Sequence, residues 1–222
     1  MKSDDPVYGT TFNLGDCYVS PIVFKHILFD ETPLVLLVFL IHERKHAKCH
    51  HLLFKFLKEK IPRIDKKQVP FVDDKEPGLK KAIQNNFPNC SIMFCWNHLK
   101  GDFKFWFKGK VETDNIRLYV DHLSKMLQSD SEEEFMELKA NLTSKWAPDV
   151  LEHFEKKNSS AIQFHSGKWL IQKYPGRFYP YSDITNNLSE SMNAVLKREQ
   201  DWKELPVDRR SSYIRVILST QF

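Results

Sequence analysis

Alternating and continuous apolar runs predict a set of strands in the first half of the chain. Residues 10–14 and 17–28 predict a hairpin, with turn-forming side chains between them. The run 33–41 is apolar on both faces and predicts a central strand; it is far too short to span a bilayer, so no membrane partner is expected. Shorter runs at 69–73 and 90–94 predict two more strands.

Between these strands the apolar period changes to that of a helix. Leucine and phenylalanine recur at helical spacing within 45–61, and the same spacing follows Pro77, a residue suited to a first helical turn. A further helix is expected to begin at Trp96. Strands that alternate with helices indicate an α/β fold in which helices cover the sheet.

The region 111–173 has helical periodicity and almost no strand signal. Within it, Ser129 to Ser131 followed by the acids Glu132 to Glu134 predicts a helix start, because a Ser or Asp cap and acids in the first turn both stabilise that end. Residues 186–199 predict one more helix after a loop rich in Tyr and Pro. This part of the chain is therefore expected to be a helical module.

Composition adds little to this pattern. Of the 222 residues, 41% are hydrophobic, enough for a sizeable core, and 33 basic against 29 acidic residues leave a formal charge of +4. This mild surplus permits a nucleic-acid partner without arguing for one, because the placement of the charge matters more than its sum. The four cysteines have no paired spacing, and no signal peptide is recognised at the polar N-terminus, which favours a reducing compartment.

Four short motifs that contain polar or metal-ligating residues follow one another along the chain. They are Thr10-Thr11-Phe12-Asn13-Leu14, Val72-Asp73-Asp74-Lys75-Glu76, Cys95-Trp96-Asn97-His98 and Thr185-Asn186-Asn187-Leu188-Ser189-Glu190-Ser191-Met192-Asn193. In this order they resemble Mutator-like (MULE) DNA transposases, whose strings are Asp before Thr-Thr-Phe, then Thr-Asp-x-Glu, Cys-x-x-His and Thr-Asn-Asn-x-x-Glu-Ser-x-Asn. Each motif is weak alone, but the ordered set is fairly specific and extends over nearly the whole chain.

The resemblance implies an RNase H-like mixed sheet flanked by helices, with an α-helical insertion before the last acidic residue. The organisation expected from it is 1–110 as the first part of the core, 111–180 as the helical insertion, and 181–222 as the return helix and C-terminal tail. The implied activity is DNA cleavage and strand transfer by an Asp, Asp, Glu set that holds two Mg²⁺ or Mn²⁺ ions. By match, Asp74 is the second acid and metal ligand, and Glu190 is the third.

The first acid of the set is missing. Gly9 occupies its position and has no ligand atom. Asp16 is a nearby carboxylate but is better explained as a turn residue, so it is a weak substitute. Asp74 also has a structural explanation as a helix cap, and Glu190 has one as an early-helix acid. We therefore expect a degraded catalytic core, and its enzymatic activity stays open.

The alternative is a non-catalytic descendant, a nuclear protein that binds DNA or a protein partner. Nuclear localisation, DNA as partner and a homo-oligomer all follow from the resemblance alone. The chain has no recognisable zinc finger for DNA ends before the core, and it stops soon after the glutamate helix, so a trimmed or decayed copy is expected.

Cys95 and His98 have the i, i+3 spacing that can place two zinc ligands on one helical face. A structural zinc site needs four ligands, and nothing in the sequence requires Cys49, His50 or His51 to supply the others. A buried Cys and a hydrogen-bonded His are the commoner outcome. A zinc-stabilised interaction module is a third, weaker interpretation.

Lys100, Lys104 and Lys108 recur every four residues in a segment rich in aromatic side chains. This pattern is typical of a face that contacts DNA phosphates, and equally of a solvated helix face. A second stripe, His42, His46 and His50, is predicted to lie on the surface rather than to bind a metal.

Overall fold

The structure is a computed structural model, and part of the chain is described. The described residues are 6–8, 12–14, 17–25, 34–42, 47–66, 70–108, 110, 113–174, 184–185 and 187–198. Gly9, Asp16 and His46, which the sequence analysis singled out, lie outside them. The fold is mixed α/β, as predicted. The chain forms two compact units, Met1–Ile92 with Asn186–Phe222 and Met93–Thr185, and each is described by itself.

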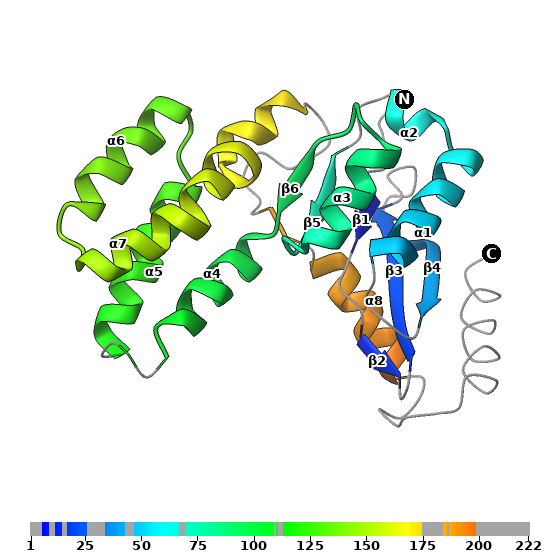
Figure 1. Cartoon of the computed structure of the whole chain (residues 1–222), viewed down its shortest axis with the longest axis horizontal. Helices are drawn as coiled ribbons and strands as arrows, with labels where there is room; N and C mark the ends of the chain where they lie inside the picture. Colours follow the sequence, from blue (N-terminus) through cyan, green and yellow to red (C-terminus); the bar gives the residue numbers. More distant parts are fainter. Residues whose placement is uncertain are drawn as a thin grey trace. The chain divides into compact units, whose positions relative to one another are not determined.

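The strands form one small mixed sheet (Figure 1). They are β1 (Pro6–Tyr8), β2 (Phe12–Leu14), β3 (Cys17–Lys25), β4 (Leu34–His42), β5 (Phe71–Asp73) and β6 (Ile92–Phe94). Their order is β2-β3-β1-β5-β6, and β4 pairs with β3. β3 is antiparallel to β1, β2 and β4, whereas β5 is parallel to β1 with Val72 opposite Val7. Because β1 and β5 are parallel neighbours, both end at the same edge of the sheet.

The prediction that the apolar run 33–41 is a central strand is wrong for the described sheet. β4 pairs with β3 and with no other described strand, so it lies at an edge. Its side chains from Val35 to Ile41 are mostly half-buried. The run is apolar on both faces because α1 packs on β4 and α8 packs on it as well. A continuous apolar pattern therefore reports coverage of both faces by helices, and not hydrogen bonding at both edges.

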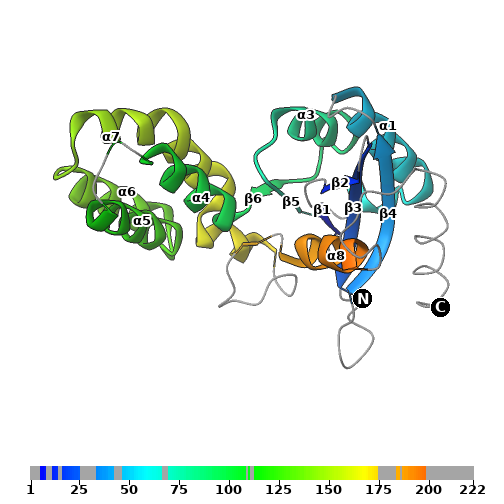
Figure 2. The same ribbon diagram turned by 90° about the horizontal axis from the view of Figure 1, so that it is seen from below.

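Helices cover both faces of this sheet (Figure 2). They are α1 (Ala47–Lys60), α2 (Arg63–Lys66), α3 (Pro77–Asn86) and α8 (Asn187–Arg198). Figure 2 shows α1 and α3 on one face and α8 on the other. On the α1 face, the rings of Phe54, Phe71 and Phe87 are fully buried, with centroids 5.4 to 6.1 Å apart. This aromatic cluster fixes β5 against α1 and the residue that follows α3.

Every element that the structure describes between residues 113 and 174 of the second unit is a helix, as predicted. Its elements are α4 (Trp96–Trp106), α5 (Thr113–Leu127), α6 (Glu132–Thr143), α7 (Pro148–Phe154), two π-helical segments at Glu155–Ser159 and Ile162–Ser166, and a 3-10 helix at Lys168–Lys173. The predicted start of α6 is confirmed: Ser131 Oγ accepts from Glu134 N at 3.1 Å, and Glu134 Oε2 accepts from Asp130 N at 2.6 Å. These two bonds satisfy backbone donors at the helix N-terminus.

The tightest glycine in the described part of the second unit is Gly167, and its replacement by Ala is expected to destabilise the protein. Its φ of −60° suits any residue, so the cost is steric. An added Cβ would lie 2.1 to 2.4 Å from ring atoms of Trp169, a buried residue packed on Phe135. We expect Gly167→Ala to lower the free energy of unfolding by about 1–3 kcal/mol.

The matched control is Gly101→Ala on α4. An added Cβ there meets nothing within 4 Å, so the change should raise the unfolding free energy by about 1 kcal/mol through helix propensity. Urea unfolding of both variants measures the difference. Shifts of the same sign in the two variants would contradict the assigned packing.

Candidate functional site

The loop after β5 carries Asp74, the residue predicted to be the second acid of the site. β5 ends at Asp73 and α3 begins at Pro77, so Asp74, Lys75 and Glu76 form the whole connection. The helix cap position falls on Glu76, whose side chain makes no capping hydrogen bond. Asp74 is half-buried and does not occupy the cap position. The explanation of Asp74 as a helix cap is therefore wrong.

Glu190, the other matched acid, lies in the first turn of α8 and is exposed. The neighbouring Met192 and Asn193 are buried, as expected for the side of α8 that packs on β1, β3 and β4. Figures 1 and 2 show α8 beginning near the end of β5 and running across the sheet toward β2. Asp74 and Glu190 thus belong to the same unit, and the end of β5 and the start of α8 lie near each other in both views.

Asp73, at the end of β5, is a fully buried carboxyl that sequence reasoning missed. Burial, and after it the charges of Asp74 and Glu76, raise the pKa of this carboxyl from an ordinary value of 3.8 to about 8, although nearby backbone N–H groups of those two residues partly offset the rise. Those N–H groups lie outside hydrogen-bonding geometry, so neither carboxyl oxygen has a hydrogen-bond partner among the residues that the structure describes. By strand alternation Asp73 shares a face with Phe71, which packs on α1, and so it points away from α8.

The predicted surface stripe of histidines is wrong for His42 and His50. Only 7% of His42 and 1% of His50 is exposed. His42 Nε2 is hydrogen-bonded to Ser20 Oγ at 2.9 Å, and its ring meets the His50 ring edge-on at 5.7 Å. His50 Nε2 in turn lies 3.3 Å from Glu76 Oε1. The reason is that α1 turns this face toward the sheet and α3, so the two imidazoles are enclosed and hydrogen-bonded.

The Cys-Trp-Asn-His motif at the start of α4 has a structural role that the sequence did not reveal. Cys95 is buried at the cap position of α4, and His98 is half-buried. Trp96 Nε1 donates to the carbonyl of Ser166 at 2.6 Å, at the end of a π-helical segment whose wider turns free carbonyl groups. The motif therefore anchors α4 to a distant helix of its own unit.

A complete metal site does not occur within the described part of the chain. No group of three or more His, Cys, Asp or Glu side chains there is placed to hold an ion. Cys95 and His98 thus lack further described zinc ligands, and zinc stays a prediction. For Mg²⁺ or Mn²⁺, Asp74 and Glu190 offer the hard oxygen donors that these ions prefer, but two carboxylates do not make up a two-ion site.

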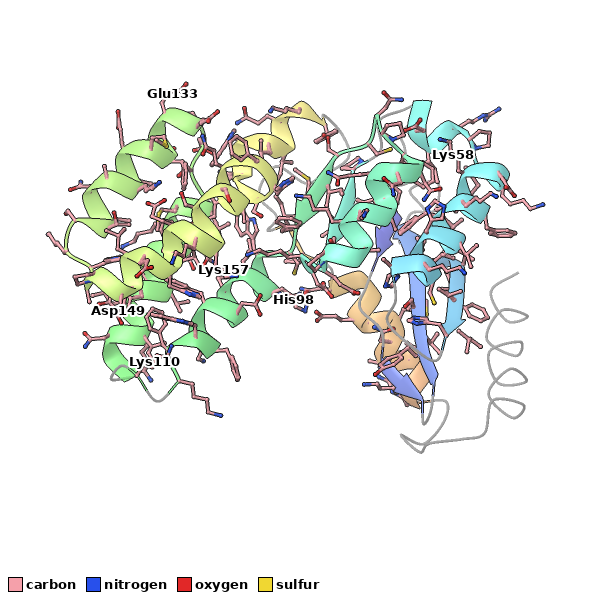
Figure 3. The ribbon with its side chains drawn as sticks, in the orientation of Figure 1. Lys58, His98, Lys110, Glu133, Asp149 and Lys157 are labelled. Carbon is pink, nitrogen blue, oxygen red and sulfur yellow. The ribbon has the colours of Figure 1, made fainter. Side chains whose placement is uncertain are left out.

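The three lysines predicted to contact DNA lie on α4 and the turn that follows it. Lys104 and Lys108 are exposed, whereas Lys100 is half-buried with its Nζ 6.0 Å from the centroid of the Trp96 ring. Lys110 adds a fourth amine, 4.1 Å above the Trp106 ring, just beyond the end of α4 (Figure 3). These positions provide a basic surface, and DNA binding stays a prediction.

Comparison with known proteins adds no further assignment. No family model and no curated protein matches this chain. Among the helices that the structure describes, none is both long and apolar enough to cross a lipid bilayer. The function is therefore argued from the residues and the fold.

Proposed function

We propose that this chain is the catalytic core of a Mutator-like transposase that has lost the first acid of its site. The observation that carries the proposal is the placement of Asp74 at the end of β5, beside β1, in the same unit as Glu190 on α8. A two-ion nuclease needs acids that are distant in sequence to converge at strand ends and on a helix.

The sheet supports an RNase H-like core. In that fold a first strand lies between an antiparallel pair on one side and parallel strands, reached through helices, on the other. Here β1 and β2 lie along one side of β3, β4 lies along its other side, and β5 continues the sheet beside β1. The helical unit Met93–Thr185 falls between Asp74 and Glu190 in sequence, which is where an insertion before the last acid is expected.

The remaining acids support metal binding but little chemistry. Asp74 and Glu190 would hold one Mg²⁺ or Mn²⁺ weakly, largely through water, because Mg²⁺ keeps much of its hydration shell. An intact Asp, Asp, Glu set would hold two ions, whose chemistry would be to polarise the scissile phosphate and activate the attacking oxygen. Gly9 supplies no ligand to bridge them. We therefore propose little or no strand cleavage by the chain as it stands.

The second candidate function is DNA binding without cleavage, in the nucleus. The exposed amines of Lys104 and Lys108, with Lys110 nearby, favour it. Lysines that contact phosphates release counterions, so binding should weaken steeply as salt rises. Lys104→Ala with Lys108→Ala should lower the affinity for a DNA duplex and flatten its salt dependence, and an unchanged salt dependence would count against this surface.

Restoring the first acid tests the transposase proposal. We expect Gly9→Asp to tighten Mn²⁺ binding roughly tenfold, which corresponds to about 1.4 kcal/mol, and Gly9→Asp with Asp74→Ala to lose that gain. Calorimetric Mn²⁺ titration and a strand-cleavage assay measure the two effects. If the parent chain cleaved DNA robustly and Asp16→Ala abolished the cleavage, Asp16 would be the missing ligand and the assignment of Gly9 as a lost site would be wrong.

A further inference from the structure

We propose that His50 and Glu76 form a positioning pair for Asp74. The contact between them ties the loop 74–76 to α1 and holds the backbone turn from which Asp74 is presented. This inference rests on the proposed function of Asp74 as a metal ligand. The motif match assigns Asp74 itself, but it assigns no task to His50 and none to the side chain of Glu76.

The loop has a backbone conformation that needs support. Lys75 has a φ of 72°, in the left-handed region, which is unfavourable for a residue with a Cβ. Such a conformation persists only when the surroundings enforce it. The sheet side of the loop is fixed, because Phe71 N donates to Ser91 O at 2.8 Å and the Phe71 ring is buried. The helix side begins at Glu76, so the fixing of Glu76 determines the turn.

Glu76 is held from outside the loop by its side chain. Glu76 O accepts from Lys80 N at 3.0 Å as the first bond of α3, while its carboxylate makes no cap and instead accepts from His50 Nε2 at 3.3 Å. A long contact to a partly exposed carboxylate contributes little energy by itself. The contact instead fixes the position of the loop, because it joins the loop to α1, a helix that packs on the same sheet.

His50 is itself held rigidly. Its ring is buried and meets the His42 ring edge-on, and His42 is hydrogen-bonded to Ser20. The sequence of contacts thus runs from β3 through β4 and α1 to the loop after β5. Side chains whose rotamers are locked by packing and a second layer of hydrogen bonds are the ones that can keep a ligand in place.

The test compares variants of the full chain in two measurements, Mn²⁺ affinity by calorimetry and amide hydrogen exchange of the segment 71–80. We expect Glu76→Ala and His50→Ala each to weaken Mn²⁺ binding about fivefold or more and to speed exchange in this segment about tenfold. Glu76→Gln removes the same charge but keeps an acceptor for His50, so both quantities should stay within about twofold of the parent. His50→Gln keeps the donor and should behave likewise. This rescue by the conservative variants separates positioning from a loss of negative charge.

Asp74→Asn is the control for the metal site, since it should lose Mn²⁺ binding without faster exchange. If Asp74→Asn lost binding while Glu76→Ala matched the parent in affinity, the positioning role alone would be rejected, whatever the exchange rate. Equal Mn²⁺ affinity of Asp74→Asn and the parent would reject the proposed metal site and the positioning role with it. Should His50→Ala fail to fold, the pair Glu76→Ala and Glu76→Gln decides the question.

Discussion

Phe103→Ala is expected to lower the free energy of unfolding of the second unit by about 4 kcal/mol. Phe103 is fully buried on α4 at the centre of an aromatic cluster. Its ring lies 4.9 to 6.3 Å, centroid to centroid, from the rings of Phe107, Trp146, His153 and Phe154. Removing the ring leaves a cavity that several rigid aromatic neighbours cannot refill, which adds to the lost burial.

The chain contains its own control two residues along the same helix. Phe105 is 74% exposed, so Phe105→Ala should change the unfolding free energy by no more than about 0.5 kcal/mol. Thermal and urea unfolding measure the stability of both variants, with the near-ultraviolet signal of the tryptophans used to monitor the transition. A cost for Phe105→Ala that approached that of Phe103→Ala would show that α4 presents a different face to its neighbours.

The sequence alone does not separate these two residues. Phenylalanine occupies every second position along 103–107, as Phe103, Phe105 and Phe107, whereas burial on a helix follows a period of 3.6 residues. The structure buries Phe103 and Phe107, four apart, and exposes the residue between them. Choosing the buried pair requires the partners on α7 and its neighbours, which come from more than forty residues further along the chain.

The same ambiguity explains why the surface prediction for His50 on α1 is wrong. The helix was predicted from the spacing of its leucine and phenylalanine residues, but two of these, Leu52 and Phe56, are 55% and 48% exposed. The buried face is His50, Leu53, Phe54 and Leu57, at the i, i+3, i+4, i+7 spacing of a core stripe. This spacing was visible in the sequence and could have placed His50 in the interior. The surface prediction for His50 follows from the polarity of histidine alone and is therefore wrong.

The sequence predicted correctly those features that depend on residues close together in the chain. The cap at Ser131, the start of α3 at Pro77 and the helical character of 113–174 depend on neighbouring residues, and each was predicted. The edge position of β4 and the burial of Asp73 depend on strand order and on helices from distant parts of the chain. Hydrophobic periodicity predicts which side chains are buried, but not which element of the fold buries them. It therefore does not predict these two features.

Replacement of the buried Asp73 is expected to stabilise the protein. We expect Asp73→Asn and Asp73→Thr each to raise the free energy of unfolding by about 3 kcal/mol at pH 8 in metal-free buffer, because each removes the buried charge. One pKa unit corresponds to about 1.4 kcal/mol, and the pKa lies near 8 against an ordinary value of 3.8, so the upper bound is about 5 kcal/mol. Relaxation and water entry reduce that bound.

The pH dependence gives the sharper test, and its sign follows from linkage. The folded protein binds the Asp73 proton more tightly than the unfolded chain does, so the stability of the parent should fall as pH rises from about 4 to about 8 and level off above. The two variants should lack this fall, and Asp102→Asn, at an exposed site on α4, should retain it. Urea unfolding from pH 4 to pH 9 measures all four curves. Either of two results would contradict this prediction: a parent whose stability did not fall over this range, or an Asp73→Asn variant less stable than the parent at pH 8. Each would mean that the buried carboxylate of Asp73 has a stabilising partner in solution and does not lower the stability of the protein.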